Sequence, residues 1–341
     1  MTTTREWVIQ DTNKGYKSLL LRNCETKEPG PNEVRLRIET FALNWGDMDL
    51  MQGRYTFVFE RLPARVGMEA CGIVDAIGDG VEGIEIGERY CTLPYFYFNR
   101  GASADSVTIN TNYITKAPEG LSAVKSASLW MQYMTAYFPL AEVSKVGPGT
   151  HVLVTGATST AGSAALEIGR ICGANMVATS RFESNRTYLM GKGANHVCLS
   201  NEDNFVEQLR DASDGKGFDV IFDPVGGTVM KRYAQVLAKN SRIYCYGFLE
   251  GVFPELPFIE LLNANGVFHP YSLFNYVENA EMREKGKAFV YQHIASGELV
   301  SEIDKVFPME GYIDAWDYMR TERQTHGKIL IETNAAASAT G

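Results

Sequence analysis

Two patterns of apolar and polar residues divide the chain. Between residues 152 and 246, short apolar runs alternate with helical stretches at intervals of about twenty residues. The apolar runs are 152–155, Met176–Thr179, His196–Leu199, Asp219–Asp223 and Arg242–Tyr246. The helical stretches are Ser163–Cys172, Glu183–Lys192, Asn204–Ala212 and Thr228–Ala238. This alternation predicts an α/β fold with a doubly wound parallel sheet, which binds ligands at the carboxyl ends of its strands.

The first 125 residues follow a different pattern. Val34, Leu36 and Ile38 alternate with charged residues, and further short apolar runs at Cys71–Ile77, Glu88–Thr92 and Ser106–Ile109 are separated by Gly and Pro. This pattern predicts a β-rich domain. Near the C-terminus, helical stretches at Glu281–Ala295 and Tyr312–Glu322 precede a strand-like run at Lys328–Ile331. We expect that run to rejoin the β-rich domain, which makes the domain discontinuous: residues 1–127 and 270–341, around residues 128–269.

The first strand of the α/β region ends in a glycine turn that predicts a nucleotide-binding site. Gly156 lets the chain turn after the strand, and Gly162 permits close packing of the helix on the strand. The N-terminus of that helix offers N–H groups and a positive dipole end to a pyrophosphate. The middle glycine of the usual fingerprint is Ser159 here, so an ordinary strand–turn–helix without a ligand stays open. The residues expected at the phosphates are Gly156, Thr158, Ser159, Thr160, Ala161 and Gly162.

Composition excludes several classes of partner. The chain has 341 residues, 45% of them hydrophobic and 21% charged, and a net charge of −9. An acidic chain without a basic run is a poor partner for nucleic acid or an anionic membrane. We expect a cytoplasmic protein, because the N-terminus lacks the apolar core of a signal peptide. The six cysteines are scattered without a Cys-x-x-Cys pair, which predicts free buried thiols.

A set of ordered motifs resembles the medium-chain dehydrogenase/reductase superfamily. The most specific is Gly67-Met68-Glu69-Ala70-Cys71-Gly72-Ile73-Val74-Asp75-Ala76-Ile77-Gly78. The others, in the order and spacing of that superfamily, are 44–47, 130–137, 223–227 and 246–247. The resemblance implies a GroES-like catalytic domain built from both chain ends, a Rossmann domain over residues 128–269, substrate bound in a cleft, and a homodimer.

Two departures from the superfamily bear on metal chemistry. Asn44 and Met68 stand where its zinc alcohol dehydrogenases have a cysteine and a histidine. An amide oxygen and a thioether do not supply the ligands that zinc prefers, so we expect no metal. The chain therefore resembles the zinc-independent, quinone oxidoreductase-like branch, which includes enoyl reductases. Without a metal to polarise a carbonyl, hydride transfer is easiest to a conjugated enone, enoyl or quinone acceptor.

The end of the second α/β strand predicts the cofactor. Thr179 and Ser180, followed by Arg181, occupy the place where an acidic residue usually selects NAD. A guanidinium and small hydroxyls suit a 2′-phosphate, so we expect NADPH. Arg186 is either a second ligand or a helix-surface residue. The resemblance adds further cofactor contacts: Thr135, Tyr137, Val225, Gly226, Gly247, Phe248 and Lys328; core packing for Tyr137 and an exposed lysine at 328 are the alternatives.

The resemblance also points to candidate residues for catalysis. Asn44 is the leading contact for the acceptor oxygen or the nicotinamide ribose, and Asp47 orients its loop or simply caps a turn. Many relatives have a tyrosine where this chain has Asp49, so Tyr55 or solvent would supply the proton. Aromatic residues suggest a bulky apolar small-molecule acceptor, with these as the expected pocket: Trp45, Tyr95, Trp130, Phe248 and Tyr271.

The sequence leaves three other functions open. One is an NADP-dependent alcohol/ketone oxidoreductase of the same fold, and another is an enoyl reductase that acts on a tethered polyketide. The third is a non-catalytic NADPH-binding protein, because fold does not fix function.

Overall fold

The computed structural model describes residues 3–55, 57–95, 101–321 and 325–333. Contacts divide the chain into two units: unit 1 comprises Met1–Met131 and Val300–Gly341, and unit 2 comprises Gln132–Leu299. The first boundary falls inside α3 (Trp130–Tyr137), close to the expected residue 128. The second lies well beyond the expected residue 270. The difference arises because α10 packs in unit 2, where Gly286 lies against Met134 and Phe138.

Unit 2 is built on a parallel sheet. Within the described residues its six strands have the order β11-β10-β9-β12-β13-β14, and every neighbouring pair is parallel. The strands are β9 (His151–Val154), β10 (Asn175–Ser180), β11 (His196–Leu199), β12 (Phe218–Asp223), β13 (Leu237–Cys245) and β14 (Val267–Pro270). The chain starts in the middle, runs to one edge and returns to the other, which is the doubly wound order of dinucleotide-binding sheets. The predicted fold class is confirmed, and β14 is a strand that the apolar pattern missed.

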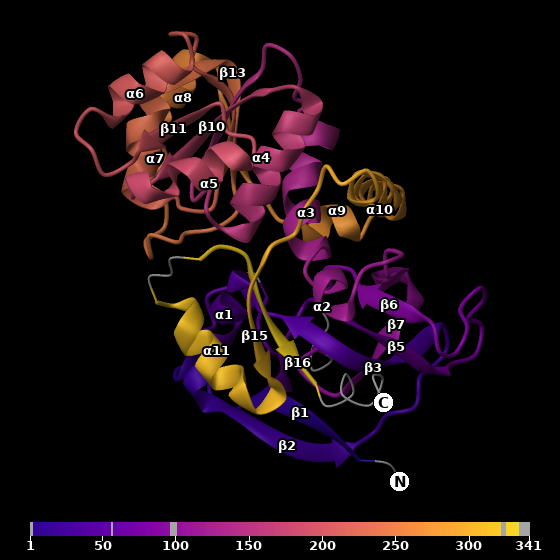
Figure 1. The fold of residues 1–341 in the computed structure, drawn as a ribbon. Coiled ribbons are helices and arrows are strands. Elements are labelled where there is room, and N and C mark those ends of the chain that lie inside the picture. The colour runs from indigo at the N-terminus through magenta and orange to yellow at the C-terminus, as the bar shows by residue number, and fades with distance from the viewer. Residues whose placement is uncertain (1–2, 56, 96–100, 322–324, 334–341) are drawn as a thin grey trace. The chain divides into compact units, whose positions relative to one another are not determined.

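Helices connect these strands and cover the sheet (Figure 1). They are α4 (Thr160–Cys172), α5 (Arg186–Gly191), α6 (Phe205–Ala212), α7 (Gly227–Tyr233) and α8 (Phe258–Ala264), with α9 (Phe274–Val277) and α10 (Ala280–Ala295) after the last strand. Phe205 and Leu209 of α6 share an apolar cluster with Met230 and Tyr233 of α7. The helix predicted over 228–238 ends early, because Leu237 already pairs with Phe218 as the first residue of β13.

Unit 1 is β-rich, as the alternating pattern predicted. One sheet has the order β2-β1-β4, and a second has the order β15-β16-β3-β5-β6-β8 with β7 paired to β3. The strands are β1 (Thr3–Ile9), β2 (Leu19–Glu25), β3 (Glu33–Ala42), β4 (Ala64–Arg65), β5 (Ala70–Ile77), β6 (Arg89–Thr92), β7 (Ser106–Asn110), β8 (Ile114–Lys116), β15 (Ile303–Pro308) and β16 (Lys328–Glu332). Its helices are α1 (Trp45–Met51), α2 (Ala123–Ser126) and α11 (Tyr312–Met319).

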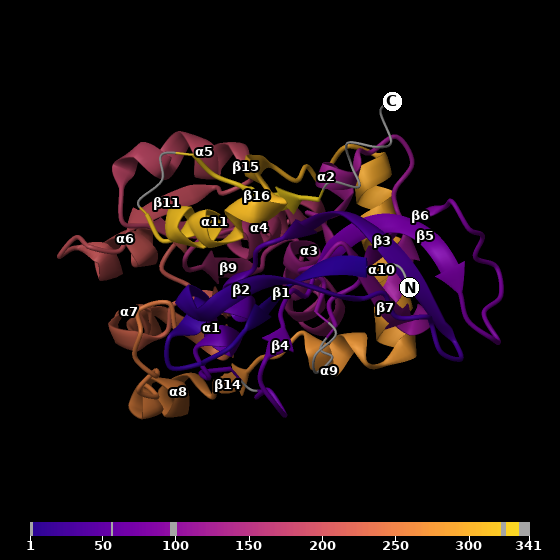
Figure 2. The same cartoon turned by 90° about the horizontal axis from the view of Figure 1, so that it is seen from below.

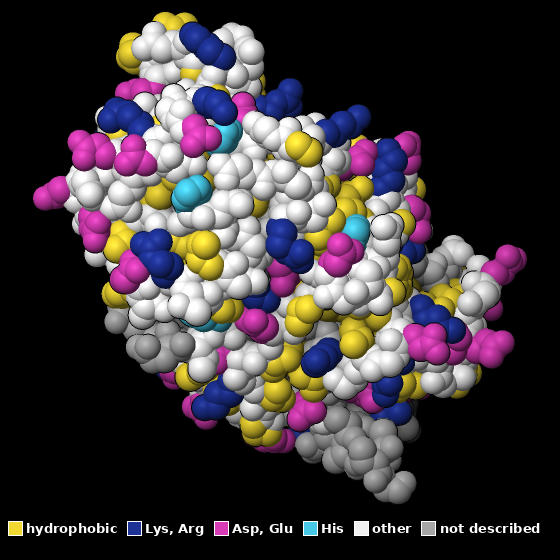
Figure 3. Space-filling model, turned by 45° about the horizontal axis from the view of Figure 1, so that its top comes forward, with side chains coloured by type: hydrophobic (Ala, Val, Ile, Leu, Met, Phe, Trp, Pro, Cys, Tyr) yellow, Lys and Arg dark blue, Asp and Glu magenta, His cyan; other side chains and the backbone are white. Residues whose placement is uncertain are grey.

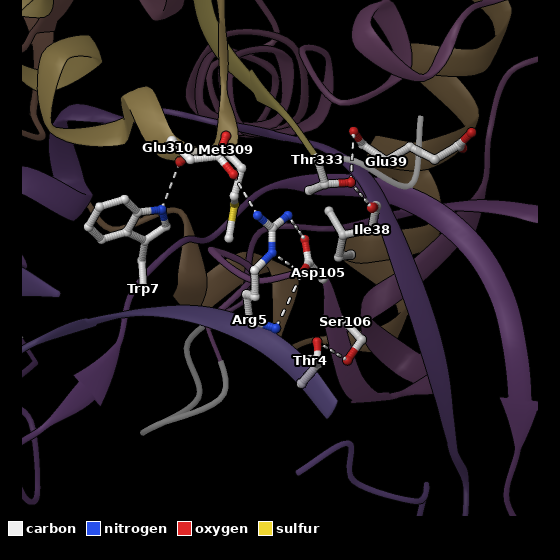
Figure 4. A network of polar contacts seen from close by, with 10 residues as sticks. All are labelled: Thr4, Arg5, Trp7, Ile38, Glu39, Asp105, Ser106, Met309, Glu310 and Thr333. Carbon is white, nitrogen blue, oxygen red and sulfur yellow. Dashed lines mark hydrogen bonds and ion pairs between the residues drawn. The ribbon is translucent and has the colours of Figure 1, made fainter. Parts of the chain in front are cut away.

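Both ends of the chain meet in unit 1. β16 pairs antiparallel with β3, so the C-terminal strand does rejoin the N-terminal domain (Figure 2). A polar network fastens the same region (Figure 4): Arg5 binds Asp105 and Glu310, and Trp7 donates to the Met309 carbonyl at 2.9 Å. Long-range strand pairing and these contacts join the N-terminal and C-terminal segments in one unit.

On the face that Figure 3 shows, Lys and Arg side chains are scattered among Asp and Glu rather than gathered in one patch. Among the described residues, no helix has the length and apolar character needed to cross a membrane.

Candidate functional site

The glycine turn between β9 and α4 is shaped so that only glycine fits at two places. Gly156 has a φ of +54°, a left-handed conformation that L side chains rarely adopt. A Cβ added at Gly162 would lie 2.6 Å from the carbonyl oxygen of Gly156 and 2.7 Å from Cα of Ala157. The helix therefore begins in close contact with the strand, as the fingerprint requires.

Ser159 takes a role in this turn that the fingerprint glycine could not. Its hydroxyl accepts the Gly162 N–H at 3.1 Å and caps α4. In the described part of the chain the N–H groups of Thr160 and Ala161 have no acceptor, so they remain available to an anion. That the Ser159 backbone faces a pyrophosphate stays a prediction, while its hydroxyl is already engaged.

Asp223 at the end of β12 ties the neighbouring strand ends together. This fully buried carboxylate accepts the Thr155 hydroxyl from the end of β9 and the Tyr233 hydroxyl from α7, the latter at 2.7 Å. It also accepts the N–H groups of Val225 and Gly226 at 2.8 and 3.1 Å. Four hydrogen bonds to one buried carboxylate fix the β9 and β12 ends relative to each other. Asp223 begins the motif at 223–227, but its sequence position alone does not predict that it joins the strand ends.

The segment after β13 closes over the same strand end. Leu249 donates its N–H to the Pro224 carbonyl at 2.9 Å, and a Cβ at Gly247 would lie 2.7 Å from that carbonyl oxygen. Phe248 packs against Phe253, with the ring centroids 5.0 Å apart and the rings tilted by 37°. Of the predicted contacts, Val225 lies beside Gly156, whose added Cβ would be 3.3 Å from it, and Gly226 lies beside Gly247, whose carbonyl oxygen would be 3.5 Å from a Cβ at Gly226.

The two arginines that follow β10 differ in their contacts: Arg181 is exposed, whereas Arg186 forms an ion pair. Arg181 is exposed, its guanidinium lies 5.3 Å from the centre of the Phe182 ring, and no ion pair of it is found among the described residues. Arg186 instead binds Glu183 at 2.8 Å and the Val197 carbonyl at 3.1 Å. The Ser180 hydroxyl holds the turn by accepting from Phe182 N and Asn185, and Thr179 is buried. The geometry favours Arg181 over Arg186 as a phosphate ligand.

In unit 1, Asn44 lies in a buried polar cluster whose other members, Glu69 and Lys328, are distant from it in the sequence. The ammonium of Lys328 donates to Asn44 Oδ1 at 2.5 Å and pairs with a Glu69 carboxylate oxygen at 2.8 Å. The other Glu69 oxygen accepts the N–H of Met131 at 2.9 Å. Lys328 is 2% exposed and Glu69 is 0% exposed, so the lysine is not the exposed residue that was one alternative.

Three acidic groups in and after α1 have raised pKa values: those of Asp47, Asp49 and Tyr55. Asp47 is fully buried and accepts the N–H groups of Asn44 and Gly67, each at 3.2 Å. Burial raises the pKa of Asp47 to about 7, although those hydrogen bonds and Lys328 oppose the shift. Burial also raises the pKa of Asp49 to about 6 against the nearby Arg54. Burial first, and then Asp47 and Asp49, raise the pKa of Tyr55, which keeps its phenol protonated.

The remaining predicted residues differ in how accessible they are. Trp45 is 36% exposed, whereas Tyr95 and Trp130 are fully buried in unit 1. In unit 2, Tyr271 is also buried, among aromatic rings that include Tyr244 and Tyr246. Thr135 and Tyr137 are buried in α3, and the Tyr137 hydroxyl donates to Glu142 at 3.1 Å. Of the expected pocket residues, Trp45 is exposed and Phe248 is half-buried, whereas Tyr95, Trp130 and Tyr271 are buried.

The residues of unit 1 do not fit a catalytic zinc. The Asn44 oxygen is bound by an ammonium group, which would repel a cation, and Met68 is buried and offers only a thioether. Across the residues that the structure describes, no three His, Cys, Asp or Glu side chains are grouped as a metal site. All six cysteines are free.

Family comparisons match both halves of this architecture. The alcohol dehydrogenase GroES-like domain family matches residues 30–136, and the zinc-binding dehydrogenase family matches residues 161–275. A 2-haloacrylate reductase from Burkholderia sp is 29% identical over 324 residues, covering 93% of this chain and 96% of that protein. A mycocerosic acid synthase-like polyketide synthase from Mycolicibacterium smegmatis is 28% identical over 93% of this chain, but only 15% of that much longer protein is covered.

Solved structures share the fold over nearly the whole chain. The quinone oxidoreductase of Pseudomonas syringae pv. Tomato has a TM-score of 0.88 at 21% identity, covering 96% of this chain and 99% of that one. The Escherichia coli quinone oxidoreductase complexed with NADPH has a TM-score of 0.87 at 22% identity, covering 97% and 100%. Two domain families of alcohol dehydrogenase type thus match successive parts of the chain, and the chain shares the fold of the quinone oxidoreductases.

Proposed function

We propose that this protein is an NADPH-dependent, metal-independent reductase of conjugated carbonyl compounds. The observation that carries the proposal is the Asn44 amide: its oxygen is held by Lys328, and its nitrogen has no hydrogen-bond partner among the described residues. A buried N–H₂ without a partner suits the oxygen of a ligand, where it stabilises developing negative charge. The 2-haloacrylate reductase and quinone oxidoreductase relatives support the same class of acceptor.

The cofactor would lie at the strand ends of unit 2. Gly156 and Gly162 let the turn and the start of α4 pack closely against their neighbours, and the N–H groups of Thr160 and Ala161 would bind the pyrophosphate. Arg181 would bind the 2′-phosphate that distinguishes NADPH from NADH. When bound, NADPH supplies a hydride. The NADPH complex of the Escherichia coli relative supports this cofactor.

The residues of unit 1 would stabilise the negative charge of the enolate and supply the proton. When hydride arrives at the β-carbon of an enone, the electron pair moves to the carbonyl oxygen and forms an enolate. The Asn44 amide would donate to that oxygen, and a proton would then return to the α-carbon. Tyr55 is protonated at neutral pH and lies near Asp47, so it or solvent would supply the proton. The partly exposed Trp45 ring would favour a bulky apolar acceptor.

A panel of acceptors tests this proposal. NADPH oxidation is followed by absorbance with an enone, the saturated ketone of the same skeleton, and a quinone. We expect the enone or quinone to turn over at least tenfold faster than the ketone. Faster turnover of the ketone would instead support an NADP-dependent alcohol/ketone oxidoreductase. Binding of NADPH with no turnover of any acceptor would support a non-catalytic protein.

A second candidate is an enoyl reductase that acts on a tethered polyketide. The similarity to a segment of a polyketide synthase favours it. Turnover of a pantetheine-linked enoyl thioester, with none of the free enone, would support this alternative over the leading proposal.

We also propose that a second copy of the chain covers the β14 edge of unit 2, which would make a homodimer. Large apolar side chains next to this edge are exposed: Phe253 79%, Phe258 67%, Ile259 59%, Leu262 67% and Val267 47%. An edge strand with apolar neighbours can pair with its own symmetry copy. Light scattering should give twice the monomer mass of 37.8 kDa, and Phe258→Lys/Leu262→Lys should halve it. A monomeric wild-type protein would refute the proposal.

A further inference from the structure

The polar cluster around Asn44 is assembled from residues far apart in the chain. Asn44 precedes α1, Glu69 precedes β5, and Lys328 begins β16. The contacts run in one line, from the Glu69 carboxylate to the Lys328 ammonium at 2.8 Å and from that ammonium to Asn44 Oδ1 at 2.5 Å. All three side chains are more than nine-tenths buried. A buried ion pair is seldom more stable than well-packed apolar side chains of the same size, so this arrangement points to a role other than stability.

The ammonium group decides which way the Asn44 amide points. A carboxamide can turn by 180° and exchange its oxygen and nitrogen, and both orientations have nearly the same shape. An ammonium has only donors, so it donates to the amide oxygen beside it and disfavours the N–H₂ group in that position. The Asn44 nitrogen is then directed away from Lys328 and remains without a hydrogen bond among the described residues.

Other charged groups near Asn44 would not fix this orientation by themselves. Asp47 accepts the backbone N–H of Asn44 and lies close enough for the Asn44 amide to help lower the pKa of that carboxyl. Because burial raises the pKa of Asp47 to about 7, its charge varies near neutral pH. Lys328, paired with a fully buried carboxylate, is the side chain that donates to the amide oxygen.

We propose that Glu69 is a positioning residue, which acts through Lys328 to hold the Asn44 amide with its N–H₂ group ready for the oxygen of the acceptor. This inference rests on the proposed function. Glu69 itself would contact neither the acceptor nor the cofactor. It holds the ammonium in place, and its second oxygen is anchored by the Met131 N–H.

The test replaces the ion pair by a neutral pair. Glu69→Gln alone would leave a buried ammonium unpaired and is expected to lower stability strongly. The double variant Glu69→Gln/Lys328→Met removes both charges, so it should fold while the amide is released. We expect kcat for enone reduction to fall about 10- to 100-fold, less than the roughly 100- to 1,000-fold for complete loss of an oxyanion donor, because the amide is released but still present.

A double-mutant cycle separates positioning from a general structural role. In an Asn44→Ala background the double variant should cause less than a twofold further loss, because its effect passes through the missing amide. A matched control removes another buried ion pair of unit 1, Glu6 with Arg65, whose atoms lie 3.2 Å apart. Glu6→Gln/Arg65→Met should lower the melting temperature but leave kcat within twofold. Equal losses in both Asn44 backgrounds would overturn the proposal.

A second readout does not depend on turnover. In ¹⁵N-labelled protein without cofactor, the side-chain amide of Asn44 is assigned by its loss in Asn44→Ala. We expect one sharp pair of proton signals in the wild type and shifted or broadened signals in Glu69→Gln/Lys328→Met. Unchanged signals would refute the positioning role even if the wild type is inactive. A wild type that turns over no acceptor would refute the proposed function, while the amide signals still decide the role of Glu69.

Discussion

The glycine turn of unit 2 and the Asn44 cluster of unit 1 are built in opposite ways. The turn spans residues 156–162, and its geometry depends on two positions where a Cβ does not fit. The Asn44 cluster joins Asn44, Glu69 and Lys328 across nearly the whole chain. The turn is a local backbone feature, whereas the cluster exists only after three distant segments have packed.

This difference explains where each site is vulnerable. A local turn fails when a side chain enters space that the backbone needs, and the failure is steric. A non-local polar cluster fails when one member loses its partner, and the cost is electrostatic. Substitutions in the two regions should therefore differ in how they depend on size, charge and pH.

Loss of the Asp223 carboxylate should have the largest effect, and it tests whether the turn is truly local. Asp223→Ala leaves the donors of Thr155, Val225, Gly226 and Tyr233 without their acceptor. We expect the free energy of unfolding to fall by about 4 kcal/mol, measured by chemical denaturation. Tyr233→Phe removes a single donor and should cost only about 1 kcal/mol.

If Asp223→Ala instead folds normally and binds NADPH as the wild type does, the turn needs no support from β12. The contrast with the Asn44 cluster would then be sharper than the contacts indicate.

A methyl group in the glycine turn should have the next largest effect. Gly162→Ala places a Cβ 2.6 Å from the Gly156 oxygen, so strand and helix must separate. We expect a loss of about 2 kcal/mol in stability and at least a tenfold weaker NADPH affinity by fluorescence titration. Gly191→Ala is the matched control, because nothing lies within 4 Å of its added Cβ. That variant should be neutral or gain up to about 1 kcal/mol.

The contrast between local and non-local structure also explains which features could be predicted from the sequence. The strands β10, β11 and β12 and the turn were predicted because apolar periodicity and glycine spacing are local signals. β14 was missed because Val267–Pro270 is short and half exposed, and its pairing with β13 gives it its structure. Lys328 was expected as a cofactor contact, but its burial against Glu69 could not be predicted, since that contact links β16 to a residue more than 200 positions away.

Substitutions at Arg181 and Arg186 can be compared for their effect on NADPH affinity, and we expect this effect to be smaller than that of Gly162→Ala. Arg181 has no ion pair among the described residues, whereas Arg186 is held by Glu183. We expect Arg181→Ala to weaken NADPH binding 10- to 50-fold, because a charge-assisted contact to the 2′-phosphate is lost, and to leave NADH binding unchanged. Arg186→Ala should change the NADPH dissociation constant less than threefold. A larger effect at Arg186 would assign the phosphate to the other arginine.

The smallest effect concerns pH and belongs to the Asn44 cluster. Burial raises the pKa of Asp47 from an ordinary 3.8 to about 7 in the folded protein. Between these values the unfolded chain has lost the proton that the folded protein keeps, so the free energy of unfolding falls as pH rises through the window. Asp47→Asn has no proton to lose. Its stability relative to the wild type should therefore increase by about 1 kcal/mol from pH 6 to pH 8, measured by denaturation at both values. Substitutions in the glycine turn, whose effect is steric, should show no such trend, and a wild-type-like pH dependence of Asp47→Asn would mean that Asp47 is ionised in the folded protein throughout this range.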